Sequence, residues 1–163
     1  MAVQKFIFVI AALLIFAAEF GLAADARADL SGAKEPYPIV ENHTADTIDS
    51  TLVDLLFFEV AEILEISVNK EFPPPRVIII SFEDLQEIYQ KSKALKPGFR
   101  AFGLYLPKNN YAILITSFDR LTLGHEFAHY FTHLYLKEPR EKWEGIAEKV
   151  ERELTSRPWS KRR

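Results

Sequence analysis

Apolar residues recur along the chain with two different periods, and their alternation predicts an order of helices and strands. Spacings of three and four residues, typical of a helix with one buried face, extend over about 47–67, 82–93, 120–136 and 140–155. Short β-branched or aromatic runs, typical of strands, occupy 76–81, 101–106 and 111–116. The resulting order is helix, strand, helix, hairpin, helix, helix, which indicates an α+β fold.

Capping residues and prolines mark the expected ends of these elements. Asp46 or Thr47 is predicted to cap the first helix, and Ser117 or Asp119 the third. Residues 29–42 are polar and contain two prolines, so we expect an extended segment there. The first helix is expected to bury its recurring apolar positions, which are Ile48, Leu52, Leu55, Leu56, Val60, Ile63 and Leu64.

The N-terminal residues differ in kind from the rest of the chain. Lys5 precedes an uncharged apolar run over 6–18, and alanine-rich sequence follows, with cleavage expected after Ala24, Ala26 or Ala28. This order is typical of a secretory signal peptide, and the run is shorter than the roughly 20 residues that span a bilayer. We therefore predict a signal peptide at 1–26, a single domain at 27–163, and export to the periplasm or the medium. In the alternative, an uncleaved signal anchors the chain and is its only membrane contact.

Composition narrows the chemistry that the domain can perform. The formal net charge is −3, so the sequence offers no concentrated basic face for nucleic acid. The chain has no cysteine, which excludes thiol catalysis, disulfides and cysteine-ligated metals. Apolar residues make up 48% of the sequence, which is enough for a packed core.

One pentad, His125-Glu126-Phe127-Ala128-His129, carries the candidate chemistry. Residues four apart share a helix face, so His125 and His129 can hold one metal ion between them, and neutral imidazole is a good zinc ligand. Glu126 would then activate a zinc-bound water as general base and pass the proton to a leaving amine. The motif alone is also compatible with two histidines and a glutamate meeting on a surface helix by chance.

Catalytic zinc needs a third protein ligand, and the last helix offers one. His133 lies eight residues beyond His125, about 12 Å along a continuous helix, so it cannot share the metal. Glu144 lies at the edge of an apolar stripe, where burial of the stripe brings its carboxylate to the seam between the two helices. Glu148, one turn further on, is expected to accept a hydrogen bond from His125, and Gly145 to permit close helix approach. An ordinary solvated acidic face is the alternative for this pair of glutamates.

The pentad followed by Trp143-Glu144-Gly145-x-Ala147-Glu148 resembles the gluzincin, thermolysin-like zinc metallopeptidases, and the resemblance covers roughly residues 76–155. It implies a small zincin-like domain with a mixed sheet, whose edge hairpin packs on the metal-binding helix and a following helix that bears the glutamate ligand. It also implies a peptide or protein substrate bound as an added strand. Larger members supply an oxyanion-stabilising Tyr or His from a further domain. Here Tyr130, His133 and Tyr105 are the candidates for oxyanion or substrate contact.

These observations favour an exported zinc-dependent peptidase with His125, His129 and Glu144 as ligands and Glu126 as the catalytic base. The alternative is a non-catalytic zinc-binding module that uses the same cleft to hold a peptide or partner. A third hypothesis is a structural surface protein without metal. The intact Glu126 argues against the second hypothesis, because a structural site has no use for a base.

Overall fold

The structure, a computed structural model, describes residues 36–45, 47–91 and 101–157. The predicted signal peptide lies outside these residues. Within the described part, no helix combines the length and the apolar character that crossing a membrane requires.

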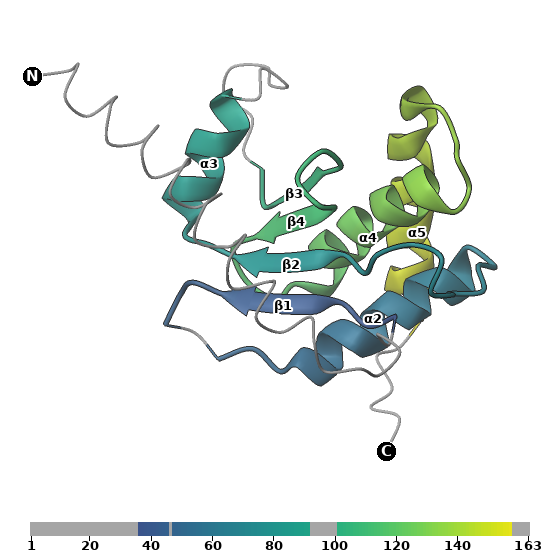
Figure 1. Ribbon diagram of the computed structural model, residues 1–163, viewed down its shortest axis with the longest axis horizontal. Helices are drawn as coiled ribbons and strands as arrows, with labels where there is room; N and C mark the ends of the chain where they lie inside the picture. Colours follow the sequence, from purple (N-terminus) through teal and green to yellow (C-terminus); the bar gives the residue numbers. More distant parts are fainter. Residues whose placement is uncertain (1–35, 46, 92–100, 158–163) are drawn as a thin grey trace, which may run out of the picture. The chain divides into compact units, whose positions relative to one another are not determined.

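Four short strands form one mixed sheet in the order β1-β2-β4-β3 (Figure 1). β1 (Ile39–Asn42), β2 (Arg76–Ile79) and β4 (Ala112–Ile115) are mutually parallel. β3 (Gly103–Leu106) pairs antiparallel with β4 and forms an edge of the sheet, which confirms the predicted hairpin. β1 belongs to the segment predicted only as extended, and Arg76 of β2 forms an ion pair with Glu41 of β1 at 2.7 Å.

The helices agree with the predicted order and differ mainly at their ends. They are α2 (Ser50–Ile63), α3 (Phe82–Lys91), α4 (Arg120–Leu134) and α5 (Trp143–Ser156), with a 3-10 turn at Arg140–Lys142 before α5. Asp49 caps α2 by accepting from the Thr51 amide, so the predicted caps Asp46 and Thr47 were wrong. Asp119 caps α4, which confirms one of the two residues predicted for this position, Ser117 and Asp119.

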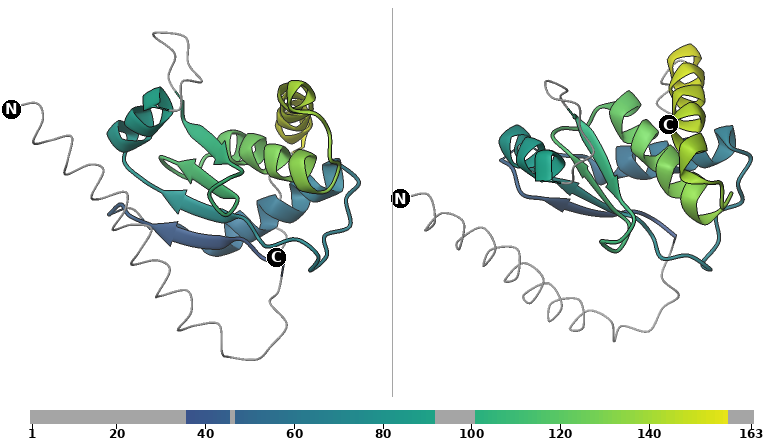
Figure 2. Two further views of the ribbon diagram at one scale, coloured as in Figure 1. Left: turned by 45° about the horizontal axis from the view of Figure 1, so that its top comes forward. Right: turned by 90° about the horizontal axis from the view of Figure 1, so that it is seen from above.

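Side chains of the sheet face two separate clusters because successive residues of a strand point to opposite sides. On one face, Val77, Ile79, Ile113 and Ile115 pack with apolar residues of α2, α4 and α5. On the other face, Ile78, Ala112 and Leu114 pack with Leu85 of α3. Figure 2 shows the same division, with α3 on one side of the sheet and the other helices opposite. The fold is therefore α+β, as predicted.

α2 buries Leu56, Val60 and Ile63 as predicted, but its buried face is shifted from the one expected. Val53 and Phe57 are fully buried, whereas Leu55, expected inside, is 41% exposed. The Phe57 ring stacks on Phe131 at 4.8 Å and meets Phe127 edge-on at 5.2 Å. These aromatic contacts with α4 set the rotation of α2.

α4 and α5 approach most closely at a glycine other than the predicted one. A Cβ on Gly124 would lie 2.4 Å from Leu154 Cδ1, whereas a Cβ on Gly145 would meet nothing within 4 Å. The expectation that Gly145 permits close helix contact was therefore wrong. Arg120 secures the far end of α5 by donating to the Leu154 carbonyl oxygen at 2.6 Å, and its guanidinium also pairs with Glu59 of α2.

Candidate metal centre

Two neighbouring helices place the predicted ligands. His125 and His129 are one turn apart on α4, so their rings lie together, with centroids 4.6 Å apart. Glu144 lies in the first turn of α5, after the chain has reversed through Glu138 and the 3-10 turn. Trp143 Nε1 donates to the Glu138 carbonyl oxygen at 2.9 Å, which fixes the start of α5.

The three side chains converge on one point. One ligand atom from each of His125, His129 and Glu144 lies within 4.8 Å of the others. The Glu144 carboxylate oxygens lie 3.4 Å from His125 Nε2 and 3.5 Å from His129 Nε2. Ligands about 2.1 Å from a tetrahedral zinc ion lie roughly 3.4 Å apart, which is close to the separation of each histidine Nε2 from its nearer carboxylate oxygen. Two imidazoles and a carboxylate thus form a candidate metal site.

His125 is oriented by a different glutamate from the one predicted. Glu151 Oε1 lies 2.7 Å from His125 Nδ1, so the Nε2 atom is the one directed towards Glu144. The predicted hydrogen bond from the His125 ring N–H to Glu148 is replaced by this contact with Glu151. On a helix, seven residues return to within about 20° of the starting direction, whereas four overshoot by about 40°. Glu151 is therefore closer than Glu148 to the direction in which Glu144 points.

The side chain of His129 is more deeply buried than that of His125. It is 8% exposed, and its Nδ1 has no hydrogen-bond partner among the described residues. Burial lowers the pKa of His129 to about 3, and the charges of His125 and Arg140 contribute in the same direction. The ring is therefore neutral at physiological pH, which is the form that binds metal ions.

Glu126 is a buried carboxyl beside the three candidate ligands. It is 7% exposed, and burial raises its pKa to about 8. The negative charges of Glu144 and Glu151 also raise this pKa, while a hydrogen bond from the backbone of Tyr105 lowers it. In the metal-free protein, this carboxyl exchanges its proton close to neutral pH. Such a pKa suits a group that both accepts and donates a proton.

The three residues predicted for oxyanion or substrate contact already have other partners. The Tyr130 hydroxyl donates to the Pro73 carbonyl oxygen at 2.8 Å, and its side chain is 1% exposed in the core. Tyr105 Oη lies 2.9 Å from His133 Nδ1, and burial raises the pKa of this phenol. The His133 ring lies 5.1 Å from that of Trp143, beside the candidate metal site.

Tyr89, which was not predicted as a site residue, interacts electrostatically with the carboxylates of the site. Tyr89 of α3 has a raised pKa, because burial and the negative charges of Glu144 and Glu126 disfavour its phenolate. α3 is held against the start of β3 through Gln86, whose Nε2 donates to the Ala101 carbonyl oxygen at 2.6 Å. The helical spacing of Phe82, Leu85, Ile88 and Tyr89 had identified Tyr89 only as an apolar position.

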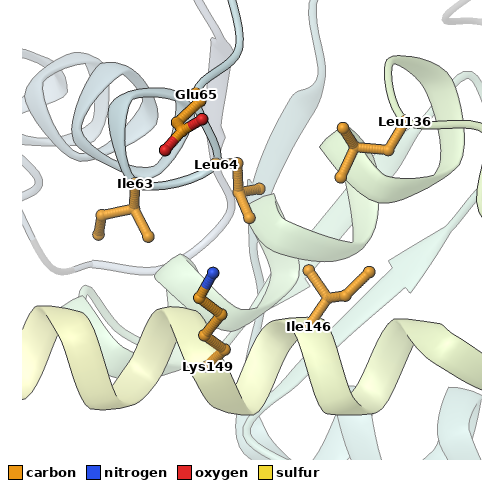
Figure 3. Close-up of a pocket in the computed structure, with 6 residues that line it drawn as sticks. All are labelled: Ile63, Leu64, Glu65, Leu136, Ile146 and Lys149. Carbon is orange, nitrogen blue, oxygen red and sulfur yellow. The ribbon is translucent and has the colours of Figure 1, made fainter.

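A pocket of about 250 Å³ lies elsewhere, and none of its lining residues belongs to the candidate site. Figure 3 shows it between the end of α2, the end of α4 and the middle of α5. Its lining residues are Ile63, Leu64, Glu65, Leu136, Ile146 and Lys149.

Comparison of the chain with models of known families, with curated proteins and with solved structures gave no match.

Proposed function

We propose that the protein is a zinc-dependent peptidase of gluzincin type, with His125, His129 and Glu144 as ligands. One observation carries this proposal: three metal-binding side chains converge next to a buried carboxyl, Glu126, whose pKa is raised to about 8. A purely structural metal site does not need an ionisable group held in this way. The donor set of two imidazoles and one carboxylate favours zinc among common ions.

Each residue has a separate role in the proposed reaction. Zinc would supply Lewis-acid polarisation of the peptide carbonyl and of a water molecule. Glu126 accepts a proton from the water and then donates it to the leaving amine, which regenerates the starting carboxylate. Glu151 holds the His125 ring with Nε2 directed inwards, as the 2.7 Å contact to Nδ1 indicates.

The substrate is an extended peptide that adds to the free edge of β3. β3 is one of the two edge strands of the described sheet and packs beside α4, so a strand added there would pass the candidate metal site. We propose Tyr89, in place of Tyr105, Tyr130 and His133, as the side chain that contacts the substrate. Its electrostatic coupling to Glu126 and Glu144 supports this choice.

We further propose that the protein is exported, on the pattern of Lys5, the apolar run at 6–18 and the alanines that follow. N-terminal sequencing of the protein recovered from outside the cytoplasm tests this proposal. A chain that starts within residues 25–29 supports export, and a protein found only in the cytoplasm with Met1 retained contradicts it.

Metal analysis combined with Glu126→Gln tests the proposed activity. The substitution preserves size and hydrogen bonding but removes the proton-accepting group. The purified wild type should contain about one equivalent of zinc and cleave a quenched-fluorescent library of unstructured peptides. The Glu126→Gln protein should retain the zinc and lose the cleavage.

The other outcomes separate the remaining hypotheses. Stoichiometric zinc without cleavage in either protein would favour the non-catalytic binding module. A protein that takes up no zinc under equilibrium dialysis would contradict the metal site itself.

A further inference from the structure

The two edges of β3 have different hydrogen-bonding roles. The Ile80 amide donates to the Ile115 carbonyl oxygen at 3.0 Å, so Ile113 and Ile115 of β4 direct their backbone polar groups towards β2. The intervening residue Leu114 therefore faces β3, where it is paired with Leu104. It follows that Gly103 and Tyr105, the alternate residues of β3, direct their backbone polar groups to the edge of the sheet that no other strand of the described residues covers.

Both of these residues contact Glu126. The Tyr105 backbone N–H donates a hydrogen bond to the Glu126 carboxyl. A Cβ on Gly103 would lie 2.8 Å from both Cγ and Oε1 of Glu126, and 3.0 Å from Cγ2 of Thr122. The glycine therefore leaves the space that the Glu126 side chain occupies. No other amino acid leaves this space open.

We propose that Gly103 and the Tyr105 amide form a backbone cradle for Glu126, and that Gly103 is a positioning residue of the peptidase. The catalytic part of this inference rests on the proposed function, whereas the contact itself does not. The strand that receives the substrate is then also the strand that holds the base. A peptide that pairs with the Gly103 backbone and the Tyr105 carbonyl oxygen would then lie beside Glu126, because the Tyr105 N–H is already engaged by that carboxyl.

Gly103→Ala tests the positioning role. The added methyl group should push the Glu126 side chain away while leaving the three ligands in place. We expect zinc content to be unchanged and kcat to fall at least about tenfold on the library peptide that is cut fastest, with KM changed less than about twofold. The matched control is Gly145→Ala, which places a methyl group in open space and should preserve kcat.

A double-mutant cycle on the metal-free protein tests the contact without using activity. Glu126→Ala removes the two Glu126 atoms that the new methyl group would meet and leaves its contact with Thr122 Cγ2 the same in both backgrounds. Gly103→Ala should raise the unfolding equilibrium constant of the wild type, measured in urea, by at least about threefold more than it does in the Glu126→Ala background. If the single variant does not fold, a folded double variant gives the same answer.

If Gly103→Ala changes the unfolding equilibrium constant equally in the wild-type and Glu126→Ala backgrounds, the proposed contact between Gly103 and Glu126 is wrong. If the cycle shows coupling between Gly103 and Glu126 but Gly103→Ala leaves kcat unchanged, Gly103 contacts Glu126 without positioning it for catalysis. A wild type that binds zinc but cleaves nothing would refute the proposed function, while the cycle would still decide whether the cradle exists.

Discussion

At the residue scale, three carboxylates of α5 have different surroundings although each lies within a turn or two of the others. Glu144 approaches both histidines and Glu151 contacts His125, whereas Glu148 has no ion pair with either histidine, although Glu144 and Glu148 are both exposed. The types and spacing of the metal-binding residues could be predicted from the sequence. The identity of the glutamate that orients His125 could not, because it depends on how α5 crosses α4.

Zinc affinity should follow this difference in geometry. Glu144→Ala removes a ligand and should weaken binding most, and Glu151→Gln should weaken it by roughly 10–100-fold through loss of ring orientation. Competition titration against a chromophoric chelator measures both. Glu148→Ala and His133→Ala serve as controls with unchanged affinity, and a larger loss in Glu148→Ala than in Glu151→Gln would show that the orienting residue is misassigned.

Removal of single hydroxyl groups should distinguish Tyr89 from Tyr130. Tyr89→Phe should lower kcat by roughly 10²-fold with zinc content unchanged, the size of effect typical of one donor to a developing oxyanion. Tyr130→Phe should leave kcat unchanged and lower the free energy of unfolding by about 1–2 kcal/mol, because the Pro73 carbonyl oxygen loses its buried partner. Steady-state kinetics and urea unfolding on both variants check this, and the opposite assignment of the two effects would contradict it.

At the element scale, helix rotation was harder to predict than helix position. The apolar residues of α2 fit more than one helical face, and the choice between Leu55 and Phe57 depends on the aromatic rings that α4 supplies. α5 has a single apolar stripe, in which Ala147, Val150 and Leu154 are fully buried and Trp143 and Ile146 are half-buried. The buried face of a helix with one apolar stripe can be predicted from its sequence. For a helix that is apolar on several sides, the buried face depends on the residues of the elements that pack against it.

Two glycine substitutions in these helices should have opposite effects on stability. Gly145→Ala replaces an exposed helical glycine in open space and should raise the free energy of unfolding by up to about 1 kcal/mol. Gly124→Ala forces a methyl group against the buried Leu154 side chain and should lower it by about 1–3 kcal/mol. Chemical unfolding followed by circular dichroism measures both, and a stabilised Gly124→Ala protein would contradict the observed close approach.

At the scale of the whole molecule, the local patterns predicted most elements but not their arrangement in the sheet. The order β1-β2-β4-β3 depends on pairing between residues far apart, such as Val40 with Val77. β1 has only four residues and follows a proline-containing segment, so its sequence alone gives little strand signal. The hairpin could be predicted because its two strands are adjacent in the chain.

Two buried ionisable groups should give the metal-free protein a defined pH dependence. Glu126 has a pKa of about 8 in the folded protein, against an ordinary value of 4.5. The folded protein therefore retains a proton that the unfolded chain releases, and stability falls as pH rises through this interval. His129 has a pKa of about 3 in the folded protein, against an ordinary value of 6.5, so its contribution to stability rises with pH over that interval. The two slopes oppose each other below about pH 6.5, and only that of Glu126 remains above it.

The free energy of unfolding should therefore fall between pH 6.5 and 8 by on the order of 1–2 kcal/mol in the metal-free wild type. Glu126→Gln has no carboxyl to titrate and should show a much flatter profile. Urea unfolding at several pH values in the presence of a chelator measures the difference. The same decline in both proteins would show that Glu126 is not its source.

The close contact between Gly124 and Leu154 fixes one end of α5, so a small tilt of the helix about this contact moves its other end by a larger distance. Leu154 lies ten residues from Glu144, about 15 Å along the helix axis. A tilt of α5 by about 5° about this contact would displace the Glu144 carboxylate by roughly 1.3 Å. Metal–ligand distances fall within about 0.2 Å of their usual values, so this displacement is several times larger than the site tolerates. Repacking at the buried end of α5 would thus be magnified at the metal site, so a substitution there could abolish zinc binding in a protein that remains folded.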